Sequence, residues 1–535
     1  MTRGTALAVS VLLAGCAASK DGLDSGPGMG PTDVASTTAT DASDIDLPTS
    51  TDTGSDWTAT GTGATAETET TTGTGTGTTT ATEPEPVSIE SVATLRPPVG
   101  LARQLSVLLS APAPLDITCT TDASPEDVLV LHSEVQTEHL VDVLGLLPDT
   151  TWACTIDAPG DRTEAELTTD PLPDDFPVLL VTAPGIPSGA WTLIHYWSHR
   201  DASKTTRAFV VDTEGRVRWW RDHDGSVDAG VEIEWLGDAL LIGGGGGVST
   251  GHPPTLLSLT GETLFSFPEL GETGGMWHHD AIRLPDGAIL GVAESPAIAP
   301  SGDDYVGLRL EARDPATGEL TWVWDSAPYV DAGLFPARDV HANAVQYVED
   351  EEGPALWVSA KLIDAVFRID WETGDVGWQL GVDGDFTLLD AEGRELGEAD
   401  WFYGQHALER EGDRLLLYDN GLRSPAADPV SRALELELDI PARTATIVWE
   451  WTEPYWQEPN WGDADRLPGG HVLVGIGHCW SCDDAGEGRS RVVELDADGG
   501  EVWRMTFDGN KDALYRADRY DGCEMFRNRR YCDSL

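Results

Sequence analysis

Basic residues are scarce in this chain of 535 residues. Lysine and arginine together number 33, against 92 aspartates and glutamates, so the formal net charge at pH 7 is -59. A charge of this size repels the phosphates of nucleic acid and argues against a nucleic-acid-binding function. An acidic surface adapted to a salty environment explains the charge and does not define the chemistry of any site.

Long hydrophobic runs are also missing. The run Ala6–Leu13 is too short to span a bilayer as a helix, and no later stretch is apolar enough to do so. Arg3, this run and the ending Leu13-Ala-Gly-Cys16 are typical of a lipoprotein signal, in which the Cys16 thiol is acylated after cleavage. A short buried helix is the alternative. We expect residues 1–16 to be a signal peptide and the protein to be an exported lipoprotein, with Ala17 favouring the outer membrane.

Apolar residues are too sparse in residues 17–85 to form a core. This segment consists almost entirely of Thr, Gly, Ala, Ser, Asp and Glu. Such a composition cannot offset the entropy lost on ordering. We therefore predict a disordered tether between the lipid anchor and the folded part of the chain.

Cysteine is rare, with seven residues including Cys16. The other six fall into three pairs by proximity in sequence or in the inferred fold: Cys119 with Cys154, Cys479 with Cys482, and Cys523 with Cys532. In an exported protein such pairs favour disulfides over metal ligands, and Cys479-Trp-Ser-Cys482 alone is a weak zinc or redox signal. The sequence predicts disulfides, no metal site and no cofactor.

Residues 86–173 show short alternating strands. The predicted strands are 87–92, 104–109, 115–119, 139–143, 152–156 and 164–167. The turn Leu147–Trp152 resembles the corner turn of a fibronectin type III-like sandwich, with Trp152 in the place of the corner aromatic. We predict a small β-sandwich that serves as a spacer or docking module.

An internal repeat dominates residues 174–535. A hairpin with a tight turn, usually containing Gly, and a Trp- or Phe-bearing second strand recurs at 209–220, 257–265, 310–322, 366–378, 433–449 and 493–503. A second hairpin precedes it, as at Leu284–Leu290 and Leu467–Leu473. Two hairpins in each of about six units predict a six-bladed β-propeller, and the folded chain as a whole is expected to be all-β.

Three histidines hold the same place in successive units. His279, His341 and His406 each begin the first hairpin of a unit, whereas the matching position before the Leu467 hairpin is Gly462. The repeat itself therefore does not require histidine. A single histidine in a strand is more often a core residue, but three at equivalent positions of a propeller converge near its axis and indicate a site. We assign His406 as the reactive residue.

Further motifs accompany these histidines. They are His278-His-Asp280, Val358-Ser-Ala-Lys361, Phe367–Gly374, Trp378–Gly381, Gln405-His406, Tyr418–Gly421 and Ala513–Asp518. This ordered set, spread from Phe176 to about Asp518, resembles the bacterial arylsulfate sulfotransferases. The resemblance implies transfer of a sulfuryl group from an aryl sulfate donor to a phenolic acceptor, without a nucleotide donor. It also implies that His406 is transiently sulfated, and the preceding sandwich fits that family.

The chemistry of these residues agrees with the implied reaction. A neutral imidazole is a competent nucleophile, and His279 and His341 can donate to the sulfuryl oxygens or shuttle a proton. Lys361 stands where the family pattern carries arginine, so it keeps the charge but loses the bidentate fork. Strand alternation allows only one of His278 and His279 to face inward, which favours His279 as catalytic and leaves His278 as a substrate-binding candidate.

Aromatic residues precede the reactive positions. Trp277, Trp401 and Tyr403 could stack on an aryl ring, or they could pack between blades. Two other functions remain open: an inactive propeller that binds a ligand or protein, and a quinone-dependent dehydrogenase. The second lacks a convincing calcium and cofactor set. The glycine run at 243–247 lacks the features of a phosphate loop, which argues against nucleotide binding.

Overall fold

The computed structural model describes residues 86–198, 206–223, 230–245, 252–270, 275–453, 456–477, 490–508, 512–532 and 534. The chain divides into two units, Met1–Ala81 and Thr82–Leu535. The predicted signal peptide with Cys16, the tether, and the pair Cys479 and Cys482 lie outside the described residues. The domain boundaries and the lipid anchor therefore stay predictions.

Strands make up nearly all the regular structure of the described residues, which confirms the all-β prediction. Helical segments are short: α1 (Ala327–Asp331), η2 (Lys361–Ile363), η3 (Glu398–Asp400) and η4 (Pro468–Gly470). None of the helices in this described part has the length and apolar character needed to cross a membrane.

The first sheet contains β1 (Ile89–Leu95), β2 (Arg103–Thr120), β3 (Val128–Val143), β4 (Thr151–Ala158) and β5 (Asp161–Thr168). Its order is β1-β2-β4-β5, and β3 also pairs with β2. The two strands predicted at 104–109 and 115–119 are in fact one strand, β2. Its register with β3 shifts between Leu108 and Leu115, where Pro112 and Pro114 supply no N–H to the ladder. These prolines mimic a turn in the sequence pattern, but they only interrupt the strand pairing.

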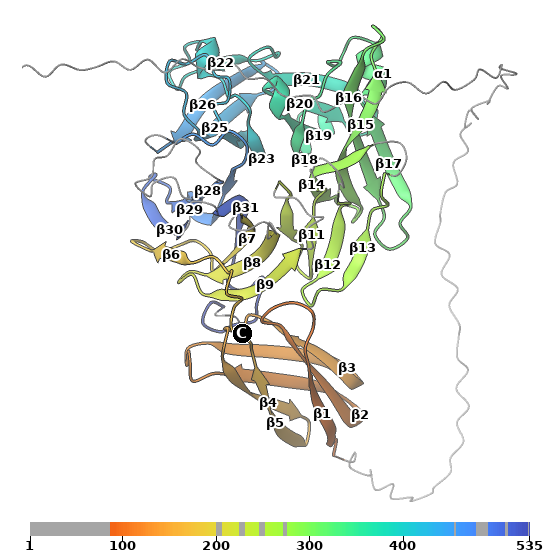
Figure 1. The fold of residues 1–535 in the computed structure, drawn as a ribbon, viewed down its shortest axis with the longest axis vertical. Helices are drawn as coiled ribbons and strands as arrows, with labels where there is room; N and C mark the ends of the chain where they lie inside the picture. Colours follow the sequence, from red (N-terminus) through yellow and green to blue (C-terminus); the bar gives the residue numbers. More distant parts are fainter. Residues whose placement is uncertain are drawn as a thin grey trace, which may run out of the picture. The chain divides into compact units, whose positions relative to one another are not determined.

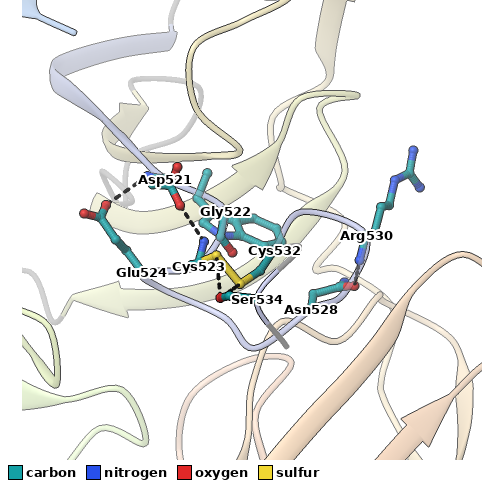
Figure 2. The surroundings of a disulfide bond; sticks show 9 residues. Asp521, Gly522, Cys523, Glu524, Asn528, Arg530, Cys532 and Ser534 are labelled. Atoms are coloured by element: carbon teal, nitrogen blue, oxygen red, sulfur yellow. Dashed lines mark hydrogen bonds between the residues drawn. A yellow bond between two sulfur atoms is a disulfide. The ribbon is translucent and has the colours of Figure 1, made fainter. Parts of the chain in front are cut away.

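Two of the predicted disulfides are confirmed. Cys119 on β2 lies directly opposite Cys154 on β4, and the two are bonded. Cys523 and Cys532 are bonded near the C-terminus, where the Ser534 hydroxyl contacts both sulfurs (Figure 2).

Six further sheets, each of four or five strands, follow in the described residues (Figure 1). They are β10 (Ile233–Trp235), β11 (Ala239–Ile242), β12 (Thr255–Ser258) and β13 (Thr263–Ser266); β14 (Met276–Arg283), β15 (Ile289–Ile298), β16 (Asp304–Arg313) and β17 (Leu320–Asp325); β18 (Ala342–Asp350), β19 (Gly353–Ala360), β20 (Ala365–Asp370) and β21 (Val376–Gly381); β22 (Thr387–Leu389), β23 (His406–Glu411), β24 (Arg414–Asp419), β25 (Arg432–Asp439) and β26 (Thr444–Trp451); β27 (Asp463–Arg466), β28 (Val472–Ile476), β29 (Arg491–Leu495), β30 (Glu501–Phe507) and β6 (Leu179–Thr182); and β31 (Asp512–Tyr520), β7 (Trp191–Ser198), β8 (Thr206–Asp212) and β9 (Val217–His223).

Each recurring hairpin of the sequence is a pair of adjacent strands in one such sheet, as for β16 with β17 and β20 with β21. Gly318 and Gly374 in their turns have φ of 74° and 75°, a conformation in which a Cβ would be strained. The final sheet joins the two ends of this region, because β31 pairs with β7 (Figure 1).

From β14 onward, one edge strand of each sheet lies beside an edge strand of the next sheet. β14 contacts β18, β18 contacts β23, and β23 contacts β27. The beginnings of these strands carry the residues of the candidate site. Residues more than sixty positions apart in the sequence are thus brought into one place.

Candidate active site

A β-bulge interrupts the ladder at or beside each histidine. The register shifts between Trp277 and Ala281, between Ala342 and Ala344, and between His406 and Glu409. Three non-glycine residues there have left-handed backbones: His279 (φ 53°), His341 (φ 50°) and Ala407 (φ 52°). Bulges re-aim side chains, and such backbone strain concentrates at functional sites.

The histidine side chains lie together. Nε2 of His279 is 3.0 Å from Nε2 of His341, and the rings of His279 and His406 are 6.5 Å apart. The ring of His278 is 4.5 Å from that of His341. The prediction that only one of His278 and His279 faces inward is wrong, because the bulge in β14 breaks the alternation on which that prediction depended.

His406 is held in one tautomer. Asn420 donates from Nδ2 to the backbone oxygens of Glu458 and, at 2.9 Å, Trp461, which fixes the orientation of its amide. Its Oδ1 must then accept a hydrogen bond from Nδ1–H of His406, at 2.7 Å. The lone pair of His406 is therefore on Nε2, and that buried atom has no hydrogen-bond partner among the described residues.

The surroundings of His406 keep it neutral. Its side chain is fully buried, and burial followed by the nearby charge of Lys361 lowers its pKa well below the usual value of 6.5. Lys361 begins η2 directly after β19, and its Nζ is 3.4 Å from Oδ1 of Asn460. Burial lowers the pKa of Lys361 to about 8. A neutral imidazole thus lies near the buried cation Lys361.

His279 and His341 form a hydrogen-bonded pair of neutral rings. Nδ1–H of His279 donates to the Gly230 oxygen, so its Nε2 accepts from Nε2–H of His341. Burial lowers the pKa of His341 to about 2 and that of His279 well below 6.5. Repulsion between a protonated ring and its neighbouring histidines is the second cause.

The sequence analysis missed several residues of this site. The ring of Tyr515 stacks on His279, with centroids 5.5 Å apart, and its hydroxyl is buried without a partner among the described residues. Arg516 donates to the Asn343 oxygen at 2.8 Å and forms an ion pair with Glu232. Both lie at a bulge of β31. The motif Ala513–Asp518 contained them but did not show which of its residues faces the histidines.

The predicted aromatic stacking residues lie in the hydrophobic core. Trp277 is 1% exposed, packs edge-on against Phe267 and donates to the Pro268 oxygen. Trp401 and Tyr403 belong to a core cluster on the β18 to β26 side, and Tyr403 donates to the Glu398 oxygen. These three aromatic residues therefore pack within the protein, the second of the two roles considered from the sequence, and do not stack on a substrate ring.

A group of buried and half-buried carboxylates lies on the edge strands β27 and β31. Oxygens of Asp463, Asp465 and Asp518 lie within 4.8 Å of one another, and Oδ2 of Asp465 has no described hydrogen-bond partner. Burial, followed by neighbouring carboxylates, raises the pKa of Asp465 and Asp518 well above the usual value. Burial raises the pKa of Glu232 to about 8.

These shifts predict stability that decreases with pH. A carboxylate with a raised pKa binds a proton more tightly in the folded state, so its favourable contribution is lost as pH rises from 4.5, the ordinary value for Glu232, through about 8. Asp465→Asn should raise Tm at pH about 8 by roughly 2 °C or more and have little effect near pH 5. Thermal unfolding followed by circular dichroism tests this, with the exposed Asp498→Asn as control. Equal changes for Asp465→Asn at both pH values would contradict it.

Comparison with known proteins assigns the family. The family model described as arylsulfotransferase (ASST) matches residues 187–516. No curated protein matches the chain. Similar solved structures include a quinoprotein alcohol dehydrogenase-like protein from Bacteroides thetaiotaomicron, with 9% identity, coverage of 81% of this chain and 95% of that chain, and a TM-score of 0.30. The periplasmic gluconolactonase of Pseudomonas aeruginosa has 13% identity, coverage of 76% and 99%, and a TM-score of 0.29. These distant likenesses carry no argument about activity.

The matched segment covers more than half of the chain and contains all four clustered histidines, Lys361 and Asn420. The chain therefore belongs to the arylsulfotransferase family and is an arylsulfotransferase, an enzyme class that uses aryl sulfate donors and phenol acceptors.

Proposed function

We propose that this enzyme transfers the sulfuryl group in two steps, through a sulfohistidine on Nε2 of His406. One observation carries the proposal: the hydrogen bond from Nδ1–H of His406 to Asn420 leaves a buried, unpartnered lone pair on Nε2 of a neutral ring. Such a nitrogen is a nucleophile without further activation. No nucleotide takes part.

In the first step, Nε2 of His406 attacks the sulfur and the bond from sulfur to the aryl oxygen breaks. Lys361 and Arg516, whose charges both act on His406, offset the charge of the sulfuryl oxygens in a loose transition state. The phenolate leaves with a hydrogen bond from Nε2–H of His341. His341 is the most exposed of the four histidines, with 27% of its side chain accessible, so the substrate enters past it.

In the second step, a phenol attacks the sulfur of sulfohistidine. Nε2 of His279, whose lone pair faces His341, takes the phenolic proton. The bond from sulfur to His406 breaks, and the free imidazole is restored with its Nδ1–H still bonded to Asn420.

The test is to trap the intermediate. Purified protein is mixed with 4-nitrophenyl sulfate without acceptor, quenched under alkaline conditions and digested. We expect a burst of nitrophenol close to the enzyme concentration and a sulfuryl mass adduct on the peptide that contains His406. An adduct on another histidine would move the nucleophile, and turnover of many aryl sulfates without any adduct would indicate direct transfer. No release at all would favour the alternative, a binding module without turnover.

The wild-type enzyme should lose activity at alkaline pH, and the Lys361→Arg variant should keep it. Because burial lowers the pKa of Lys361 to about 8, the lysine loses its charge as pH rises through that value, whereas arginine stays protonated. The wild-type rate of nitrophenol release should fall by up to about tenfold per pH unit above the pKa. Single-turnover measurements without acceptor exclude titration of the phenol. An unchanged alkaline limb in the variant would refute this role of Lys361.

We also propose a domain organisation for the chain, including its membrane anchor. We infer six blades of a β-propeller at 174–535 from the six sheets and from the pairing of β31 with β7. The sheet at 86–173 is proposed as a fibronectin type III-like sandwich. Acylated Cys16 and the tether of residues 17–85 are proposed to hold the enzyme at the outer membrane, on the basis of the sequence patterns.

A further inference from the structure

A carboxylate lies against two rings of the histidine cluster, those of His278 and His341. Oε1 of Glu294, on β15, is 3.3 Å from Nε2 of His278 and 3.9 Å from Nδ1 of His341. Ligand atoms of Glu294, Asp339 and His341 all lie within 4.8 Å of one another. The sulfuryl transfer described above gives no role to Glu294 or Asp339.

The hydrogen bonds around these rings fix where the lone pairs point. His278 donates from Nδ1–H to the Ala342 oxygen at 3.1 Å, so its lone pair is on Nε2. Nδ1–H of His279 is committed to Gly230, so His341 donates from Nε2–H and keeps its lone pair on Nδ1. Two imidazole lone pairs therefore face the same oxygen of Glu294.

A cation placed among these groups satisfies all of them at once. A proton on Glu294 pairs with only one of the two imidazoles and leaves the other lone pair facing oxygen. A metal cation accepts electron pairs from both nitrogens and from the carboxylate at once. The separation of 3.3 Å between His278 and Glu294 is that of two ligands about 2.0 to 2.1 Å from one tetrahedral Zn²⁺.

We infer that the protein binds a divalent transition metal ion of the Zn²⁺ type through Nε2 of His278, Nδ1 of His341, and the carboxylates of Glu294 and Asp339. Two imidazoles with oxygen ligands suit zinc better than calcium or magnesium, which prefer oxygen alone. The contacts of an outer shell are also present. The Ala342 oxygen orients His278, and the carboxylate of Asp339 accepts the backbone N–H of His341 at 2.8 Å.

The site goes beyond the proposed sulfuryl transfer and does not depend on the sulfohistidine. An ion on Nδ1 of His341 withdraws electrons from its ring and makes Nε2–H a stronger donor. That N–H points toward Nε2 of His279, 3.0 Å away. Metal occupancy would thereby regulate the hydrogen bond offered to the phenolic oxygen, while Nε2 of His406 remains free of metal.

The experiment measures binding, so it does not depend on turnover. Full-length protein is stripped with a chelator, dialysed, and titrated with Zn²⁺ by calorimetry and with Co²⁺ by visible absorption. We expect a single saturable ion per chain and Co²⁺ d–d bands without a thiolate-to-cobalt charge-transfer band. Glu294→Gln should weaken Zn²⁺ binding by more than the roughly 10- to 100-fold lost when an outer-shell partner is removed.

Two variants control for other metal-binding groups. Asp465→Asn alters the separate aspartate group, and Cys479→Ser alters the Cys-x-x-Cys pair; neither should change the affinity. His278→Ala, verified as folded by near-ultraviolet circular dichroism, should reproduce the loss seen with Glu294→Gln. Absence of saturable binding to the wild type, unchanged affinity in Glu294→Gln, or a thiolate band that Cys479→Ser abolishes would each overturn the assignment.

Discussion

His406→Ala should lower the rate of nitrophenol release from 4-nitrophenyl sulfate by at least about 10⁴-fold, since loss of a covalent nucleophile costs 10⁴- to 10⁶-fold in well-studied enzymes. The reason is that, among the ring nitrogens of the described cluster, Nε2 of His406 is the buried one that has no hydrogen-bond partner. His279 and His341 use their Nε2 atoms on each other, and Nε2 of His278 faces Glu294. Stopped-flow absorbance with and without phenol measures both half-reactions.

His132→Ala is the matched control for this substitution. His132 lies on β3, and 53% of its side chain is accessible. The control should release nitrophenol at the wild-type rate and carry the same mass adduct. If His406→Ala kept more than about a hundredth of the rate, the two-step mechanism through this residue would be rejected.

Asn420→Ala should lower the rate of the first step by about 10²- to 10⁴-fold, with KM changed far less. Asn420 contacts Nδ1 of His406 and lies away from the reacting Nε2, so it acts by positioning. Without the acceptor at Nδ1, the proton is free to move to Nε2, and a histidine in the wrong tautomer is inactive as a nucleophile. An imidazole held in the wrong tautomer costs about 10⁴-fold in serine proteases.

A spectroscopic readout separates this role from a structural one. Nitrogen NMR of histidine-labelled protein should show His406 protonated on Nδ1 in the wild type and a changed tautomer in Asn420→Ala. Asn528→Ala is the control, because Asn528 is also a buried asparagine and donates to Asp127 at 3.0 Å without contacting His406. It should retain the wild-type tautomer and most of the rate. A rate loss in Asn420→Ala with an unchanged tautomer would assign the loss to packing.

The sequence contained enough information for the all-β class, the repeated hairpins and two disulfide pairs. Alternating apolar residues and turn glycines are short-range signals, so they are read directly from neighbouring positions. The convergence of His279, His341 and His406 also followed from the repeat, because equivalent positions of the sheets lie near one another. Strand ends were less certain: Pro112 and Pro114 in β2 have the local composition of a turn.

The tertiary structure alone decided which nitrogen of each histidine carries the proton and which one has a lone pair. The bulge that brings His278 beside His279, and the left-handed backbones of His279 and His341, depend on strand pairing that alternation does not encode. The lone pair on Nε2 of His406 depends on Asn420, and the orientation of Asn420 depends on carbonyl groups of Glu458 and Trp461, about forty residues further along the chain.

Buried hydrogen bonds between distant strands explain why the sequence determined the residue types of the site but not their protonation and orientation. A side chain's residue type fixes its range of chemistry, and the sequence determined that a histidine cluster belongs to an arylsulfotransferase. Which nitrogen carries the proton, and whether Glu294 or Trp277 faces the cluster or the core, is set by partners that only folding brings within about 3 Å.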